Sequence, residues 1–182
     1  MNPLNIIEKH YSPGSEVYRI LVDHSQKVAD KALEIARGLP LLNPDLDFIE
    51  KAAMLHDIGI CLTRSKAIGC KGELPYICHG YLGRELLDKE GLDPAFGRVA
   101  ERHTGAGISL ANILNHDLPL PKRDMVPVSP EEKIICCADK FFSKSPKKRN
   151  RIFTVEDITD ELGRIDPEHA HRFSRWAEEF RL

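Results

Sequence analysis

Residues 52–59 read Ala-Ala-Met-Leu-His-Asp-Ile-Gly, and the interpretation of the whole chain starts from this stretch. It places an imidazole, His56, directly beside a carboxylate, Asp57, at the end of an apolar helical run. Adjacent residues of a helix diverge by about 100° around its axis, so one side chain can point into a site while its neighbour reaches across it. A lone His-Asp pair is common in proteins. The case for a site therefore depends on which other residues face the same interior.

The length and composition are those of a globular protein. The chain has 182 residues, of which 42% are hydrophobic, and this is enough for one domain with a sizeable core. No apolar run approaches the roughly 20 residues that cross a bilayer. The N-terminus lacks the pattern of a secretion signal, so we expect a cytoplasmic protein with no membrane partner. Five cysteines without Cys-x-x-Cys spacing are expected to be reduced and mostly buried.

Helical periodicity runs through almost the whole chain and predicts an all-α fold. We expect helices over about 15–37, 44–59, 79–89, 93–103 and from 129 to beyond 139, followed by C-terminal helices within 152–182. Residues 61–76 are interpreted as a loop or lid, the proline-rich residues 118–127 as an extended loop, and no strand is expected. We predict one domain over residues 1–182, with its core at about 15–144 and the C-terminal helices packed on it.

Several predicted helices carry an ionisable side chain on their apolar face. Taken alone, an inward histidine is more often a hydrogen-bonded core residue than a ligand, and an inward aspartate is often half of an ion pair. Burying an unpaired carboxylate costs several kcal/mol or more, and a cation relieves that cost. Together, these residues on separate helices predict a metal site made of His24, His56, Asp57, His79, His103 and Asp139.

The order of these six residues resembles the HD-domain superfamily of metal-dependent phosphohydrolases, and His-Asp-Ile-Gly at 56–59 matches its HDIG variant. The likeness extends over about 15–144 and implies a bundle of five or more core helices around a metal site. Residues 79–80, 103–105 and 132–139 are similar to the subgroup that hydrolyses diadenosine tetraphosphate symmetrically. Residues 72–76 and 118–121 resemble a set of HD proteins of archaea and bacteria that have no assigned substrate.

The resemblance implies roles for the six residues. One metal would be bound by His24, His56, Asp57 and Asp139, and a second by His79 and His103, with Asp57 bridging the two. His56 and Asp57 would then form the catalytic centre. Nitrogen and carboxylate ligands suit iron, manganese or another first-row divalent ion better than magnesium or calcium. Two such metals lower the pKa of a bridging water and clamp a phosphoryl oxygen, so no protein nucleophile is required.

One departure from the family pattern concerns phosphate binding. Related proteins often have a lysine shortly after the HDIG motif, where this chain has Ile60 and Cys61. Since phosphate needs donors and positive charge, the candidate contacts are Arg64, Lys66, Lys71, Arg102 and Lys140. The basic run over 144–151 could touch nucleic acid or a polyphosphate. It lacks aromatic residues and lies in a chain of net charge −2, so a solvated linker is the preferred interpretation.

Two further groups of residues receive plain structural interpretations. The remaining histidines, at 10, 116, 169 and 171, are expected on the surface. The stripe of Phe173, Trp176 and Phe180 is interpreted as core, with a homodimer contact as the alternative.

The functional prediction is a phosphohydrolase with two metals, acting on a small phosphorylated substrate such as a nucleotide or dinucleoside polyphosphate. Three alternatives stay open. They are an HD nucleotidase with one metal, a di-iron oxygenase of the kind that some HD relatives form, and a module that binds a nucleotide without turning it over.

Overall fold

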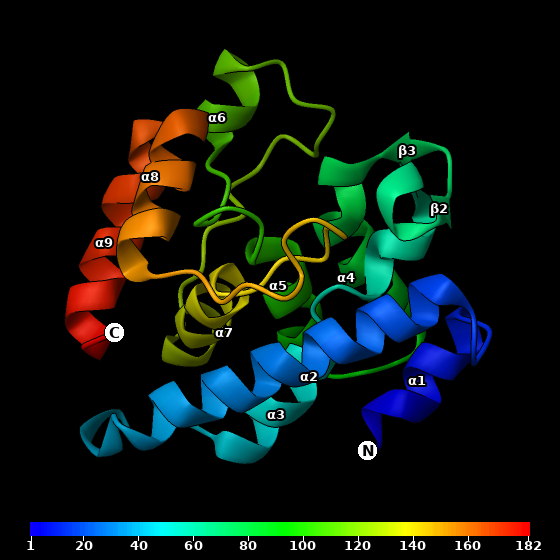
Figure 1. Cartoon of the computed structure of the whole chain (residues 1–182), viewed down its shortest axis with the longest axis horizontal. Coiled ribbons are helices and arrows are strands. Elements are labelled where there is room, and N and C mark those ends of the chain that lie inside the picture. The colour runs from blue at the N-terminus through cyan, green and yellow to red at the C-terminus, as the bar shows by residue number, and fades with distance from the viewer.

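The structure, a computed structural model, describes residues 1–182 and is built mainly of α-helices (Figure 1). This confirms the predicted all-α class. The helices are α1 (Pro3–His10), α2 (Glu16–Arg37), α3 (Leu46–Leu55), α4 (His79–Lys89), α5 (Pro94–Arg102), α6 (Leu110–Asn115), α7 (Pro130–Lys140), α8 (Val155–Ile165) and α9 (Pro167–Phe180). Short 3-10 helices occupy Pro40–Leu42, Ile58–Leu62, Lys66–Ile68 and Tyr76–Cys78.

A small sheet lies in the segment that was expected to be a loop. Its strands are β1 (Thr63–Ser65), β2 (Cys70–Lys71) and β3 (Leu74–Pro75), in the order β2-β1-β3. Strand β1 is antiparallel to β2 and parallel to β3. The expectation that the chain has no strand was therefore wrong. Strands of two or three residues are too short to show the alternation of apolar and polar residues by which a strand is recognised.

Local capping explains where the main helices begin. The Ser15 side chain accepts a hydrogen bond from the backbone N–H of Tyr18 at the start of α2. Ser129 does the same for Glu132 in α7, where Pro130 occupies the first helical turn. The sequence analysis missed α1 and α6, which have only eight and six residues. Helices this short give too few turns for a clear periodic signal.

The main core draws residues from every helix except α6, whose Ile113 belongs to a separate cluster of six buried residues. One cluster of 36 buried residues runs from Ile6 to Phe180 and includes Phe173 and Trp176, so the aromatic stripe on α9 is core, as predicted. Four of the five cysteines are buried, Cys61 is partly buried, and all are free thiols, which also agrees with the prediction. That residues 1–182 form one HD domain stays a prediction. None of the helices combines the length and the apolar composition needed to cross a membrane.

The helices converge on the chain around His56. Helix α2 crosses the front of the molecule with α3 behind it, and the segment after α7 passes over the centre toward α8 (Figure 1). Gly59, the last residue of the quoted stretch, lets α4 approach closely. A Cβ at this position would lie 2.1 Å from the His79 carbonyl oxygen and 2.4 Å from the Gly83 nitrogen. Only glycine at position 59 allows the start of α4 to lie this close to residues 56–59. His79, the first residue of α4, is thereby placed beside them.

Candidate metal centre

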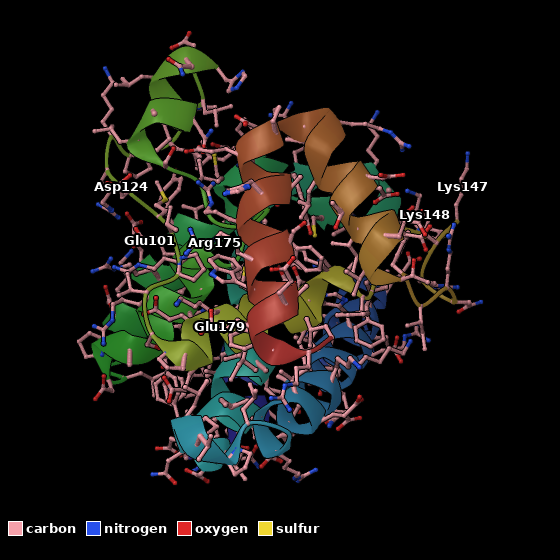
Figure 2. The ribbon with its side chains drawn as sticks, turned by 90° about the vertical axis from the view of Figure 1, so that its left-hand side faces the viewer. Glu101, Asp124, Lys147, Lys148, Arg175 and Glu179 are labelled. Carbon is pink, nitrogen blue, oxygen red and sulfur yellow. The ribbon has the colours of Figure 1, made fainter.

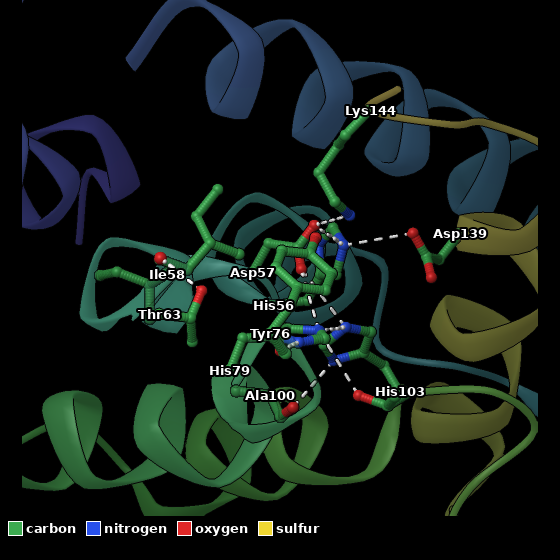
Figure 3. Close-up of polar contacts among 12 residues, drawn as sticks. His56, Asp57, Ile58, Thr63, Tyr76, His79, Ala100, His103, Asp139 and Lys144 are labelled. Carbon is green, nitrogen blue, oxygen red and sulfur yellow. Dashed lines mark hydrogen bonds and ion pairs between the residues drawn. The ribbon is translucent and has the colours of Figure 1, made fainter. Parts of the chain in front are cut away.

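The structure brings together all six residues that were predicted to bind metal, and Figure 3 labels five of them, His56, Asp57, His79, His103 and Asp139. They come from the middle of α2, the end of α3, the start of α4, the end of α5 and the end of α7. Each is at most 7% exposed: His24, His56, Asp57, His79, His103 and Asp139. They form two groups that share Asp57, and within each group the candidate ligand atoms lie within 4.8 Å of one another.

The first group surrounds one oxygen of Asp57. Oδ2 of Asp57 lies 3.3 Å from His24 Nε2 and 3.1 Å from His56 Nε2. Asp139 closes the group, because its Oδ1 lies 2.9 Å from His24 Nε2 and 3.5 Å from His56 Nε2. Two imidazole nitrogens and two carboxylate oxygens therefore face one point.

The second group surrounds the other oxygen of Asp57. Nε2 of His79 and Nε2 of His103 lie 3.0 Å apart, and each is 3.4 Å from Asp57 Oδ1. Asp57 thus presents Oδ2 to the first group and Oδ1 to the second. A carboxylate placed in this way is suited to bridge two cations.

Backbone carbonyls orient three of the four imidazoles. Nδ1 of His56, His79 and His103 lies within hydrogen-bond distance of the carbonyl three residues earlier, and donation to that carbonyl directs Nε2 toward the other ligand atoms. The acceptors are the oxygens of Ala53, Tyr76 and Ala100, at 2.5, 2.6 and 2.8 Å. Histidine ligands of metals are commonly held in this way, which fixes the tautomer and the direction of the coordinating nitrogen.

Two observations show that the group fits a cation. His56 Nε2 and Asp57 Oδ1 are buried and make no hydrogen bond, which is costly unless a further partner is present. The Lys144 ammonium also reaches into the first group, where it contacts Asp57 Oδ2 and lies 3.1 Å from His24 Nε2 (Figure 3). A positive charge is therefore accommodated among these ligand atoms.

The electrostatics favour the ionisation states that metal ligands need. Burial opposes charge on Asp57, but Lys144 and His56 outweigh it and hold the pKa of the carboxyl well below its usual range. Lys140 and Lys144 do the same for the pKa of Asp139. Burial lowers the pKa of His79 to about 3 and also lowers the pKa of His103.

His56 differs from these two histidines. Despite its burial, the carboxylates of Asp57 and Asp139 raise its pKa to about 9. With ionised carboxylates and neutral imidazoles in the second group, the site can bind a divalent metal once the proton on His56 is displaced.

Comparison with known proteins agrees with this geometry. The model of the family described as HD domain matches residues 21–143. The chain belongs to the HD superfamily of metal-dependent phosphohydrolases. An uncharacterised protein of Methanocaldococcus jannaschii is 35% identical over 123 residues, which are 66% of this chain and 65% of that protein. The narrower likeness to diadenosine tetraphosphate hydrolases stays a prediction.

Two further relatives are longer proteins. They are named tRNA (cytidine(56)-2'-O)-methyltransferase, come from Picrophilus torridus and Thermoplasma volcanium, and are each 32% identical to this chain. The alignments cover 78% and 81% of this chain but only 35% and 38% of those proteins. The chain thus spans less than two thirds of the length of each of these three relatives.

A solved structure shares the fold. It is the HD domain of the L. monocytogenes phosphodiesterase PgpH in complex with cyclic-di-AMP, with a TM-score of 0.53 and 18% identity. The match covers 91% of this chain and 82% of that one. At this identity the likeness concerns the fold alone.

We call the six candidate ligand residues described above the HD centre. A cavity of about 420 Å³ opens beside it. His79, His103 and Asp139 contribute to its wall, together with three lysines at 140, 144 and 148. The wall on the α8 side is mostly apolar, with Phe153, Ile158 and Leu162, and also carries Glu161, which pairs with Lys148. The cavity is therefore basic near the metal-ligand residues and apolar farther away.

Of the five predicted phosphate contacts, only Lys140 lines this cavity. Residues 61–76 fold into the small sheet and line part of the cavity through Ser65, Ala67, Ile68 and Tyr76. The basic side chains of this segment, Arg64, Lys66 and Lys71, are exposed and outside the cavity wall. Arg64 donates a hydrogen bond to the Glu73 carbonyl. Arg102 forms an ion pair with Glu132 at 2.8 Å, outside that wall. The structure thus does not bring these four residues to the HD centre.

Sequence reasoning missed two basic residues and misplaced one histidine. Lys144 was assigned to a solvated linker, but its side chain reaches the centre, and Lys148 lines the cavity. The available signal was that Lys144 follows Asp139 by little more than one helical turn. His169 was expected on the surface, but it is 5% exposed, and its Nδ1 lies 3.3 Å from the backbone nitrogen of Ala106.

Proposed function

We propose that this HD protein is a hydrolase that uses two divalent metals to cleave a phosphoester or phosphoanhydride bond in a small phosphorylated molecule. A nucleotide or a dinucleoside polyphosphate is the substrate class we favour. The observation that carries this proposal is the position of Asp57, which offers one oxygen to each of two groups of ligand atoms. Both groups lie beside a cavity with basic and apolar parts.

The first metal would be held by His24, His56, Asp57 and Asp139, and the second by Asp57, His79 and His103. Imidazole and carboxylate ligands favour iron or manganese. A divalent metal in this position polarises a phosphoryl oxygen and activates water for attack on phosphorus, so the chain needs no nucleophile of its own. Cytoplasmic location and homodimer formation stay predictions.

The chain's own contribution is to bind and orient the substrate. Lys140, Lys144 and Lys148 face the cavity from one segment, and ammonium groups are suited to bind phosphoryl oxygens. Lys148 is held by Glu161 at 2.5 Å. The apolar wall from α8 offers a surface for an uncharged organic group such as a nucleobase. The cavity therefore suits a molecule that has a phosphate at one end, near the lysines, and a flat organic group at the other, against the α8 wall.

The experiment is a product-release assay on a panel of compounds, with protein reconstituted anaerobically with Fe²⁺ or Mn²⁺. The panel contains mononucleotides, dinucleoside polyphosphates and sugar phosphates. Cyclic dinucleotides are added because PgpH was solved with cyclic-di-AMP. Nucleoside 2',3'-cyclic phosphates are added because two relatives carry a tRNA enzyme's name.

The control variants are Asp57→Asn, which keeps the shape of the side chain, and Asp30→Asn, an exposed position on α2. We expect release that disappears in Asp57→Asn and persists in Asp30→Asn. No release from any compound, by protein shown to hold two metals, would contradict the proposal. Oxygen consumption in that case would identify the di-iron oxygenase, and tight nucleotide binding without product would identify a binding module.

A further inference from the structure

A second cavity, of about 330 Å³, lies on the other side of Lys144 from the first. It is formed between α2 and the segment that follows α7. The two cavities share Phe142, Ser143 and Lys144, and the second one reaches His24 of the first ligand group. A molecule bound at the HD centre can therefore extend into either cavity.

The second cavity is strongly basic. Arg19 and Lys27 contribute from α2 and Arg149 from the segment after α7, and only two of its ten lining residues are hydrophobic. Its one acidic residue, Asp23, is already paired with Lys27 at 2.7 Å. Arg19 and Arg149 form no ion pair, so their guanidinium groups are available to an anion.

The larger apolar surface belongs to the first cavity, since the second has only Ile20 and Phe142. Phe153, Ile158 and Leu162 line the first cavity and not the second. The two cavities thus differ in chemistry, and each is lined by part of the ligand set: His79, His103 and Asp139 for the first cavity and His24 for the second. In hydrolysis the attacking water and the leaving oxygen lie roughly in line through phosphorus. The leaving group and the part of the substrate that stays on phosphorus are different substituents of this atom, so they extend in different directions.

We propose that the cavity lined by Arg19 and Arg149 is an anion subsite that binds further phosphoryl groups of the substrate. The inference rests on the proposed function. It narrows the substrate class from phosphate compounds in general to phosphoanhydrides. The organic group then lies against α8, the phosphorus that is attacked lies beside Lys144, and the remaining phosphate chain extends along α2. In the reaction, water forms a new P–O bond and the bridging P–O bond breaks. The electron pair leaves with the departing phosphate, one proton of water stays on the new hydroxyl, and the other passes to the departing oxygen or to solvent.

The test measures binding, so it does not depend on turnover. Inorganic tripolyphosphate and inorganic phosphate are titrated by calorimetry into the full chain, freed of metal because tripolyphosphate chelates metal ions. We compare wild type with Arg19→Gln, Arg149→Gln and the double variant. Both arginines are exposed, so the substitutions leave the core intact.

Two control variants match these substitutions in chemistry and location. Arg37→Gln lies on α2 but outside the cavity, and Lys147→Gln lies in the same segment as Arg149. Figure 2 shows Lys147 extending away from the molecule. The controls remove the same amount of positive charge without altering the cavity.

We expect tripolyphosphate to bind wild type at least about tenfold more tightly than phosphate does, because additional charge-assisted hydrogen bonds form. Each arginine substitution should weaken tripolyphosphate binding by roughly three- to tenfold, while both control variants bind tripolyphosphate as wild type does. Equal affinity for the two anions, or equal losses in the controls, would overturn the subsite.

The result is separable from that of the product-release assay. A confirmed subsite in a protein that hydrolyses none of the compounds would leave the subsite standing and reject the hydrolase. Hydrolysis of monoesters, together with unchanged tripolyphosphate binding in the double variant, would support the hydrolase and reject the subsite.

Discussion

The ammonium group of Lys144 contacts Oδ2 of Asp57, the carboxylate oxygen that also faces His24 and His56. The Lys144 ammonium and a divalent metal ion would therefore compete for the same carboxylate oxygen, Oδ2 of Asp57. Lys144 comes from the segment after α7, outside the helices that carry the ligands, and it also borders both cavities. A lysine in this position can leave the carboxylate when a metal binds and turn its charge toward a substrate phosphate.

The first prediction concerns the replacement of this lysine. Lys144→Met should bind Mn²⁺ about tenfold more tightly than wild type, because the variant has no ammonium group that repels the incoming cation. Without metal the variant should melt at a lower temperature, because Asp57 then lacks its partner. Calorimetric Mn²⁺ titration and thermal melts with and without metal measure both effects, with Lys147→Met as the exposed control. Weaker Mn²⁺ binding by Lys144→Met would show that the lysine supports the metal instead of competing with it.

The second prediction separates a site for two metals from a site for one. His79→Ala removes a ligand of the second group only, since His79 contacts Oδ1 of Asp57 and none of the first group's ligand atoms. The metal content should fall from two ions per chain to one, as measured by elemental analysis after reconstitution. His116→Ala, at an exposed histidine, should retain two. One ion per chain in both wild type and His79→Ala would establish the nucleotidase with one metal.

Five of the six residues at the centre were predictable because each was placed on an apolar helical face that must turn inward, and Asp57 because it is adjacent to His56. The apolar faces alone did not predict how close the six side chains lie to one another. Their separation depends on close approach between segments, such as the contact between Gly59 and the start of α4. The family resemblance supplied that information. The binding of metal by these residues remains a prediction.

The phosphate-binding residues were harder to predict, because charge in a sequence does not show which direction a side chain takes. Arg64, Lys66 and Lys71 were chosen because they lie in the segment expected to cover the site, but their side chains are exposed while Ser65, Ala67 and Ile68 of the same segment line the cavity. Lys144 was assigned to a solvated linker because its basic run lacks aromatic residues and the chain has a net charge of −2; in the structure only the later residues of that run, 146–151, are exposed. Whether a basic side chain reaches the cavity, as Lys144 does, or stays exposed depends on packing between distant segments of the chain. Local sequence patterns do not show that packing.

The third prediction tests the close approach at Gly59. In Gly59→Ala the new methyl group would collide with the backbone of α4, and backbone atoms cannot move aside as a flexible side chain can. We expect a loss of about 3 kcal/mol in the free energy of unfolding, together with weakened binding of the second metal as His79 is displaced. Gly163→Ala is the matched control. Its nearest neighbour, the Cβ of Ala170, is 3.6 Å away, and helical propensity predicts a gain of about 0.5–1 kcal/mol. Urea denaturation measures both changes, and equal stability of wild type and Gly59→Ala would refute the packing argument.

The fourth prediction concerns His169, which packs against the chain that follows His103. A Cβ on Gly105 would lie 2.3 Å from His169 Nδ1, so the contact is tight. Burial is the main cause that lowers the pKa of His169 below its ordinary value of 6.5; Arg172 and Lys140 add to it, and Asp166 and Glu168 oppose it. The folded protein therefore binds a proton at His169 less readily than the unfolded chain does.

The sign of the pH effect follows from this difference. Stability from neutral His169 is complete above about pH 6.5, and it decreases as the pH falls from 6.5 toward the lowered pKa, because the unfolded chain takes up the proton first. His169→Gln lacks this titration. The stability difference between wild type and His169→Gln should be largest near pH 8 and should shrink below pH 6.5, by at most about 1.4 kcal/mol per pH unit.

Urea denaturation of metal-free protein between pH 5 and 8 measures this difference. The other buried histidines titrate equally in both proteins and cancel in the comparison. His171→Gln, at an exposed histidine on the same helix, should show no such trend. A difference between wild type and His169→Gln that is constant with pH would mean that His169 is as easily protonated in the folded protein as in the unfolded chain. Its contact with Ala106 would then stabilise the loop after His103 without making that loop sensitive to acid.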